Sequence, residues 1–424
     1  MRFTPVPHLR RPALTLLACL LAACGGGGGG GGADEAATAP VDEGDAQSLA
    51  ARWVRIANEY QSFTVQGTQT VRYGLDTRWV QKRVSGSGQC TNAFFGSDPA
   101  RGVDKVCERL ESDVPPGNAR YGDFRGASVG HNADLNGAIA FPANNPWNTD
   151  ISRAPRDPNS DALIASIGLS TGLHNDFGSG TWNGAPIGIP YVVVAGSQPN
   201  VTVAFGDYAD ESDPGPYPVP RTAPIEQGPS SSGDRHVLVI DRDRNRLYEM
   251  GNAYPNADGS WRASGGAVFH LDSNVVRPGG QPGWTSADAA GLPIFPGLVR
   301  YDEASRGPGG IQHALRFTVQ RTRRAYVPPA THWASSNTSA NLPPMGMRVR
   351  LKPDYVIPAS FSRETRAILT ALKTYGMFVA DNGSNWFISG APDPRWNDDR
   401  LRSELRQVKG SHFEVVRMDG LVTP

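Results

Sequence analysis

The sequence predicts a mainly β protein, with a small N-terminal β module and a large β-sandwich or jelly-roll-like domain that contains a few helices. Short apolar runs recur along the chain and are separated by turn residues, among them 49 Gly and 35 Pro. Near the N-terminus, two segments alternate β-branched or aromatic residues with polar ones. Segments with the apolar spacing of an amphipathic helix are few. Many short strands joined by Gly- and Pro-rich turns are typical of two packed sheets.

The first element in the chain is a segment typical of bacterial export. Basic residues precede an apolar run over residues 13–23, which is shorter than the about 20 residues that a permanent transmembrane helix needs. The run ends in Leu-Ala-Ala-Cys, which resembles the lipobox of bacterial lipoproteins. This resemblance implies cleavage after residues 1–23 and lipidation of Cys24, palmitate included. We therefore expect a lipid-anchored protein of the cell envelope, at the outer membrane or cell surface; the alternative is an ordinary secretory signal that contains a cysteine.

Residues 24–50 are expected to form a flexible tether, because eight consecutive glycines followed by small and acidic residues have almost nothing to bury. The whole chain has 41 basic and 41 acidic residues, so nothing in its charge attracts nucleic acid. We expect no nucleic-acid partner, and contact with the membrane through the lipid anchor only.

Residues 51–112 are predicted to form the small β module, with alternating strands at 63–73 and 78–84. A module of this size buries little apolar surface, so it needs additional stabilisation. Cys90 and Cys107 are the two cysteines that remain after export and lipidation, and in an oxidising compartment we expect them to form a disulfide.

Three stretches of this module carry a resemblance: Phe-x-Val-x-Gly-Thr-x-x-Val-Arg-Tyr-Gly from Phe63, Asn-Ala-Phe-Phe-Gly-Ser-Asp-Pro from Asn92, and Lys-Val-Cys from Lys105. The pattern is similar to a short disulfide-bonded module that is appended to secreted bacterial glycan-degrading enzymes. It implies that the partner is a polysaccharide or cell-surface glycan. The alternative is a spacer without a ligand.

Residues 113–136 are rich in Gly, Asn, Asp and Pro and are predicted to be a linker, and residues 137–424 to be the large domain. Its helices are expected over 159–167 and 362–376, the second with Ser362 as N-cap. A hairpin is expected over 377–388. Strands are predicted at 188–194, 201–205, 236–240, 247–249, 297–301, 314–319 and 348–351.

The large domain also contains several short motifs that carry a resemblance. They include Pro-Trp-Asn from Pro146, Tyr-Ala-Asp-Glu-Ser-Asp-Pro-Gly-Pro from Tyr208, Gly-Asp-Arg-His from Gly233 and Ile-Gln-His-Ala-Leu from Ile311. These motifs resemble those of an uncharacterised family of secreted bacterial proteins. The resemblance spans most of the domain and implies no mechanism.

The first candidate site residues are Asp210 and Glu211, which lie with Asp213 in a loop after the strand at 201–205. Glycoside hydrolysis needs two carboxylates with different affinities for protons. The loop is expected to supply one or both of them. The alternative is a solvated turn.

The second candidate is Glu303 with His313. Both lie near a Gly-Pro-Gly-Gly loop between two predicted strands of one hairpin, and alternation places them on the same face. Asp234 and His236 share a face at the entry to another apolar strand and are expected to join them. Such a group suits proton transfer or, as an alternative, a metal site, although no close-spaced zinc motif is present.

Five tryptophans, Trp396 among them, lie in Gly-, Pro- or Asn-rich segments, and four of these are predicted to stack on a sugar. These predicted substrate-binding residues are Trp147, Trp182, Trp284 and Trp333.

Together these patterns favour a surface-tethered carbohydrate-active enzyme, most simply a glycoside hydrolase acting on a polysaccharide, with a polysaccharide lyase as a variant. Glu303 and one of Asp210 or Glu211 are the expected carboxylates, assisted by His313, Asp234 and His236. No cofactor is expected for this activity. The alternatives are a non-catalytic glycan-binding or adhesion lipoprotein and a hydrolase that depends on a divalent metal.

Overall fold

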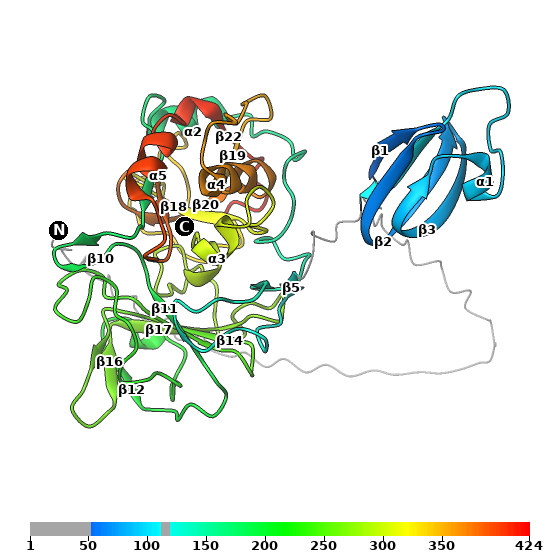
Figure 1. Cartoon of the computed structure of the whole chain (residues 1–424). Helices are drawn as coiled ribbons and strands as arrows, with labels where there is room; N and C mark the ends of the chain where they lie inside the picture. Colours follow the sequence, from blue (N-terminus) through cyan, green and yellow to red (C-terminus); the bar gives the residue numbers. More distant parts are fainter. Residues whose placement is uncertain (1–51, 112–118) are drawn as a thin grey trace, which may run out of the picture.

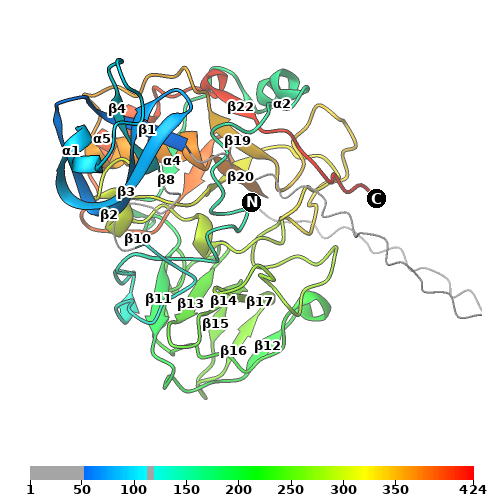
Figure 2. The same cartoon turned by 90° about the vertical axis from the view of Figure 1, so that its right-hand side faces the viewer.

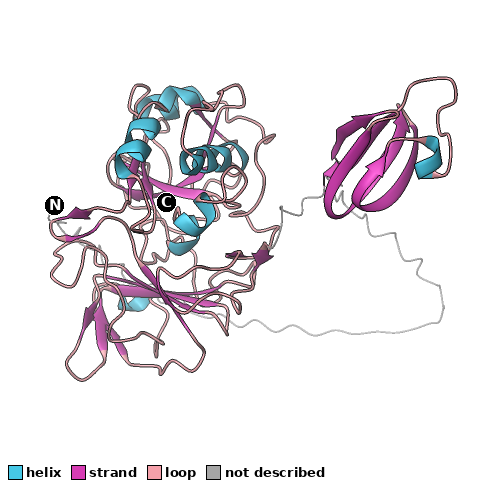
Figure 3. Ribbon diagram, in the orientation of Figure 1, coloured by secondary structure: helices cyan, strands magenta, loops and turns pink. Residues whose placement is uncertain are grey.

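A computed structural model describes residues 52–111 and 119–424, and it confirms the mainly β prediction (Figure 1). The described residues form 22 β-strands in several sheets, against five α-helices. In the large domain the helices gather around one of these sheets (Figure 3). The predicted signal, the tether and Cys24 lie outside the described residues. No helix in the described ranges is long and apolar enough to cross a membrane.

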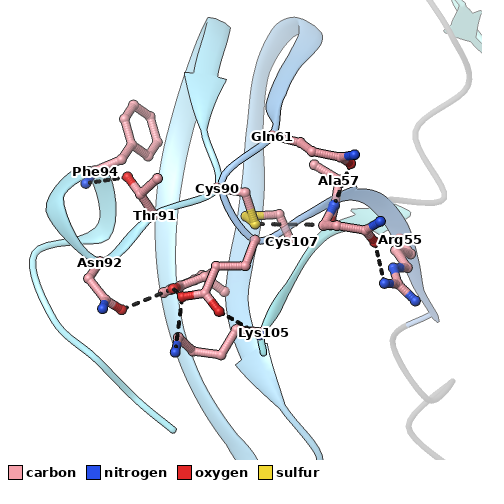
Figure 4. The surroundings of a disulfide bond; sticks show 12 residues. Arg55, Ala57, Gln61, Cys90, Thr91, Asn92, Phe94, Lys105 and Cys107 are labelled. Carbon is pink, nitrogen blue, oxygen red and sulfur yellow. Dashed lines mark hydrogen bonds and ion pairs between the residues drawn. A yellow bond between two sulfur atoms is a disulfide. The ribbon is translucent and has the colours of Figure 1, made fainter. Parts of the chain in front are cut away.

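The small module is a four-stranded antiparallel sheet in the order β1-β4-β2-β3. One face buries an apolar cluster in which Tyr73 stacks on Phe95 of α1. The predicted disulfide between Cys90 and Cys107 is confirmed and belongs to this cluster (Figure 4). The elements are β1 Arg52–Asn58, β2 Ser62–Leu75, β3 Arg78–Gln89, α1 Asn92–Phe95 and β4 Val106–Glu111.

The large domain contains a five-stranded sheet that is covered on both faces. Along β11, Tyr191 and Val193 belong to the main core, whereas Val192 and Val194 belong to a second core. Successive side chains of a strand point to opposite faces, so a strand between two cores must be apolar throughout. A six-stranded sheet contributes to the main core and a three-stranded sheet to the second. The five-stranded and six-stranded sheets occupy different halves of the domain in both views (Figures 1 and 2).

The two larger sheets are mixed, since β11 runs parallel to β13 and β18 parallel to β20. The five-stranded sheet has the order β17-β14-β13-β11-β6 and the six-stranded sheet the order β22-β19-β20-β18-β21-β8. The strands of the five-stranded sheet are β6 Gly130–His131, β11 Tyr191–Val194, β13 Val237–Asp241, β14 Arg246–Gly251 and β17 Gly265–His270. Those of the six-stranded sheet are β8 His174–Asp176, β18 Leu315–Val319, β19 Arg348–Leu351, β20 Met377–Asn382, β21 Phe387–Ser389 and β22 Phe413–Val415.

The remaining elements are short sheets and helices that connect or cover these layers. The three-stranded sheet consists of β12 Val203–Phe205, β15 Tyr254–Pro255 and β16 Trp261–Ala263. Two pairs of strands are β5 Arg120–Tyr121 with β7 Ala138–Ile139, and β9 Thr181–Trp182 with β10 Ala185–Pro186. The helices are α2 Ser160–Ile167, α3 Tyr301–Ala304, α4 Arg363–Thr374 and α5 Asp398–Leu405, with the 3-10 turns η1 Ala209–Glu211, η2 Phe295–Gly297 and η3 Gly410–His412.

Helix α4 begins and ends where the sequence predicts. The Ser362 hydroxyl accepts the backbone N–H of Thr365 at 3.2 Å, and Gly376, just beyond the helix, has a φ of 66° that favours glycine. The apolar stripe of the helix, which includes Ile368 and Leu372, is buried.

Two predicted hairpins are wrong. Residues 297–303 form no strand, because η2 ends at Gly297 and Tyr301 begins α3. β20 and β21, expected to pair with each other, both pair with β18, which lies between them. In the first case helical turns replace the expected strand, and in the second pairing with the distant β18 replaces the local hairpin.

The predicted linker over 113–136 also needs correction from residue 119 onward. Phe124 and Leu135 are buried in the main core, and β6 joins the five-stranded sheet. The Gly- and Asn-rich composition of this stretch therefore reflects tight turns of the large domain, as at Asn132 and Asn136, which both have positive φ.

Candidate active site

Glu303 and His313 lie in contact within the large domain. His313 Nε2 lies 3.0 Å from Glu303 Oε1, and Arg300 Nη2 donates to Glu303 Oε2 at 2.7 Å. His313 Nδ1 donates to the carbonyl oxygen of Ala314 at 2.8 Å. Burial by itself would raise the pKa of Glu303, but the charges of Arg300 and His313 lower it instead.

This pair leaves no room for a substrate. Glu303 is 5% exposed and His313 2% exposed. The cavity beside Asp302 and Glu303 has a volume of about 10 Å³, which is space for one water at most. Glu303 also accepts the backbone N–H of Arg300 at the start of α3. The enclosure fits a structural ion pair and argues against the catalytic roles expected of Glu303 and His313.

The other predicted acids do not join this pair. Asp210 and Asp234 are exposed, and Glu211 Oε2 accepts the backbone N–H of Thr285 at 2.8 Å. No hydrogen bond or ion pair in the described part of the chain links any of the three to Glu303 or His313. The expected convergence of these acids and imidazoles at one site is therefore corrected: Asp210 and Asp234 lie at the exposed surface, and Glu211 is bound to the loop that contains Thr285.

His236 has a partner that the sequence analysis did not identify. His236 Nδ1 lies 2.6 Å from Glu226 Oε2, and Nε2 lies 2.9 Å from the carbonyl oxygen of Ala287. Both ring nitrogens face acceptors, which fits a protonated imidazole. Burial would lower the pKa of His236, but the charge of Glu226 outweighs that effect and raises it to about 9. In turn, His236 lowers the pKa of Glu226 against the opposing effect of burial.

Glu226 lines a cavity of about 490 Å³, a volume in the range of small-molecule sites. The cavity wall also contains Asp176, the last residue of β8. The Asp176 side chain is exposed to the cavity but surrounded by protein, and this desolvation, with the negative charge of Glu226 second, raises its pKa. The cavity thus contains two carboxyl groups whose pKa values are shifted in opposite directions.

A buried charge cluster lies behind these carboxyl groups. Arg316 of β18 donates to Asp288 at 2.8 Å. Burial, followed by the charge of Asp288, raises the pKa of Asp381 on β20 to about 7. Burial also raises the pKa of Glu249 on β14 to about 7. The charge of His236 opposes the rise in the pKa of Asp288, Asp381 and Glu249, so this cluster is coupled electrostatically to the His236–Glu226 pair.

Of the four predicted substrate-binding tryptophans, Trp182 lines the cavity and is 68% exposed. Trp147 is 1% exposed and packs edge-on against Phe378 in the main core, which corrects its assignment as a substrate-binding residue. Trp284 and Trp333 are half-buried and lie outside the cavity wall. A tryptophan in a loop-like sequence segment can therefore pack on a core or face a cleft, and the segment alone does not distinguish the two cases.

No local pattern of residues indicates a role for Asp176 or Glu226. Each is a single acid in a segment rich in turn residues: Asp176 lies in Asn-Asp-Phe-Gly and Glu226 in Ile-Glu-Gln-Gly. Only the fold brings the end of β8 beside the loop that precedes β13. The usable signal was His236, whose position at the start of a buried strand implies a partner for its ring.

Among residues 52–111 and 119–424, no group of three or more His, Cys, Asp or Glu side chains is placed to hold a metal ion. No family model matches the chain, and no solved structure matches it. A function for the cavity has to be argued from its own side chains.

Proposed function

We propose that the chain is a glycoside hydrolase that cleaves a polysaccharide in the cavity between Asp176 and Glu226. The observation that carries this proposal is a cavity of about 490 Å³ whose wall contains two carboxyl groups, Asp176 with a raised pKa and the His236-bound Glu226 with a lowered pKa. Glycoside hydrolysis requires one carboxyl group that is protonated and one that is ionised at the same pH. The two residues replace Glu303 and Asp210 or Glu211 as the proposed carboxylates.

The mechanism follows from these states. Asp176 donates its proton to the glycosidic oxygen, so that the leaving sugar departs as an alcohol. Glu226, kept ionised by His236, stabilises the positive charge that develops on the sugar ring, either by attacking the anomeric carbon or by activating a water. His236 acts through Glu226 and is a positioning residue. Trp182 offers an exposed ring against which the C–H groups of a sugar pack.

We further propose that the enzyme acts at the cell envelope, at the outer membrane or cell surface, held by lipid on Cys24. The Leu-Ala-Ala-Cys sequence after an apolar run supports this tether. The disulfide-bonded module between tether and large domain supports a glycan partner only through its resemblance to modules of secreted glycan-degrading enzymes.

Reducing-end release from a panel of polysaccharides tests the activity. The wild type is expected to cleave at least one polymer, and Asp176→Asn and Glu226→Gln each to lower kcat by at least about 100-fold. The alkaline limb of the kcat/KM profile is expected to follow the loss of the Asp176 proton and to disappear in Asp176→Asn.

Asp210→Asn is the matched control, because this acid is exposed and lies outside the cavity wall. Its kcat is expected to equal that of the wild type. Full activity in both Asp176→Asn and Glu226→Gln would overturn the site. Binding without cleavage of any polymer would overturn the enzyme and favour a glycan-binding lipoprotein. Activity that is lost with a chelator and restored by a divalent ion would favour a metal-dependent hydrolase.

A further inference from the structure

The cavity wall contains two arginines at the C-terminal end of helix α5. Arg402 lies in the last turn of α5 and Arg406 directly follows the helix, four residues later. Residues spaced by four lie one above the other on a helix face. Both arginines are exposed, and both lower the pKa of His174, another residue of the wall, in the same direction as the larger effect of its burial. The two guanidinium groups therefore lie on one side of the cavity.

Neither arginine has a partner for its charge among residues 52–111 and 119–424. In the described part of the chain no side-chain hydrogen bond or ion pair is recorded for Arg402 or Arg406, whereas Arg400 of the same helix pairs with Glu404 at 2.8 Å. An unpaired guanidinium group offers a planar set of N–H donors that matches a carboxylate or sulfate group in two parallel hydrogen bonds.

The acids of the cavity offset these two positive charges only in part. Glu226 is paired with His236, and the carboxylate of Asp398 accepts the backbone N–H groups of Ser179 and Gly180 at 2.7 and 2.8 Å. Asp176 takes part in the proposed proton transfer in its neutral form. Asp398 keeps its negative charge in these hydrogen bonds and offsets one guanidinium group, so with Asp176 neutral the wall has one positive charge in excess at the end of α5.

We propose that the cavity binds an anionic glycan, whose sugars have carboxylate or sulfate groups, and that Arg402 and Arg406 bind those groups. This inference gives the substrate class of the proposed hydrolase. Cleavage of the anionic glycan rests on the proposed function, whereas its binding does not. The two arginines determine specificity, since a neutral glycan leaves both guanidinium groups without a partner.

Calorimetric titration of the full chain tests the inference, in an Asp176→Asn background that prevents turnover. The probes are oligosaccharides of polygalacturonate, alginate and hyaluronan for carboxylates, of chondroitin sulfate and heparin for sulfates, and fully methyl-esterified oligogalacturonides as the neutral counterpart. At least one charged probe is expected to bind about tenfold or more tightly than the neutral one, and raising the salt is expected to weaken this binding. The probe that binds decides between carboxylate and sulfate.

The double variant Arg402→Gln/Arg406→Gln is expected to lose that preference, with an affinity for the charged probe at least about tenfold lower. Arg417→Gln, an exposed arginine outside the cavity wall, is the control and is expected to bind as before. Equal binding of charged and neutral probes, no binding of any charged probe, or an unaffected double variant would each overturn the inference.

The two proposals fail separately. Arginine-dependent binding of an anionic glycan that the wild type never cleaves would overturn the hydrolase and leave the ligand class standing. Cleavage of neutral polymers that depends on Asp176 and Glu226 but not on the arginines would overturn the ligand class and leave the hydrolase standing.

Discussion

At the residue scale, the protonation state of Glu226 depends on His236, a side chain that does not line the cavity. His236 is buried, and its two ring nitrogens face the Glu226 carboxylate and the Ala287 carbonyl oxygen. A buried carboxylate without a counter-charge takes up a proton, because desolvation penalises the charged form. The imidazolium keeps Glu226 ionised beside a cavity in which Asp176 has a raised pKa. Burial and the charge of Glu226 raise the pKa of Asp176, whereas the charge of His236 lowers that of Glu226 against the effect of burial.

This pairing predicts a stability that depends on pH. The folded-state pKa of His236, about 9, lies above the unfolded value of about 6.5, so its contribution to the free energy of unfolding is complete below about pH 6.5 and is lost as the pH rises through 9. Glu226, with a lowered pKa, contributes above its unfolded value and loses that contribution only in acid. We expect urea midpoints of the wild type to fall between about pH 7.5 and 9.5.

His236→Gln is the matched variant, since it has a similar size and no titrating group. It is expected to be less stable at neutral pH and to show a smaller fall in midpoint over that range. The raised pKa values of Glu249 and Asp381, about 7, lie below the range, so these acids contribute little to the slope. Equal slopes in wild type and variant would show that His236 is not charged in the folded protein.

Sequence reasoning identified some of these residues and not others for a physical reason. His236 and Trp182 stand out because a histidine at the start of a buried strand and a tryptophan in a Gly-rich turn are each unusual in their local text. Asp176 and Glu226 are ordinary in theirs. The raised pKa of Asp176 comes from desolvation and from the charge of Glu226, and the lowered pKa of Glu226 comes from the charge of His236, which outweighs burial. Glu303 and His313 do lie together, although the pair is enclosed and has no access to a substrate.

At the element scale, local signals predicted elements whose ends are determined locally. Helix α4 has its cap, apolar stripe and final glycine within one stretch of sequence. The expected hairpin of β20 and β21 failed because β18, distant in the chain, pairs with both of them. Turn residues indicate only that the chain reverses direction. Which strands pair depends on contacts between residues that are distant in the sequence.

Asp398, the first residue of α5, is expected to hold part of the cavity wall in place. Asp398 accepts the N–H groups of Ser179 and Gly180, which precede the β9–β10 hairpin and Trp182. Asp398→Ala removes both bonds, so we expect the hairpin to loosen, KM to rise about tenfold with a smaller change in kcat, and stability to fall by about 1–3 kcal/mol.

Steady-state kinetics and hydrogen exchange at residues 179–182 measure these effects. Asp399→Ala is the control, because this neighbouring acid is exposed and lies outside the cavity wall. The same kinetics in both variants would mean that the hairpin is held by other contacts.

At the scale of the whole molecule, composition and alternation were enough to predict the mainly β class and the disulfide-bonded module. The mixed sheets of the large domain were not predictable, because the continuous apolar runs of β11 and β13 fit any strand that is buried on both faces. The structure adds that the module has an apolar cluster of its own, which shares no buried residue with the cores of the large domain. The two parts are therefore expected to unfold independently.

Removing the disulfide tests this independence. The bond between Cys90 and Cys107, separated by 17 residues, restricts the unfolded chain, and its loss in Cys90→Ala/Cys107→Ala is expected to destabilise the module by about 3 kcal/mol. In a small module this lowers the melting temperature by roughly 10–20 °C. Differential scanning calorimetry of the full chain is expected to show the module transition shifted or lost and the large-domain transition unchanged, and reduction of the wild type should have the same effect. A shift of both transitions together would mean that the two parts share interactions beyond their separate cores, and the module would then stabilise the domain that contains the cavity.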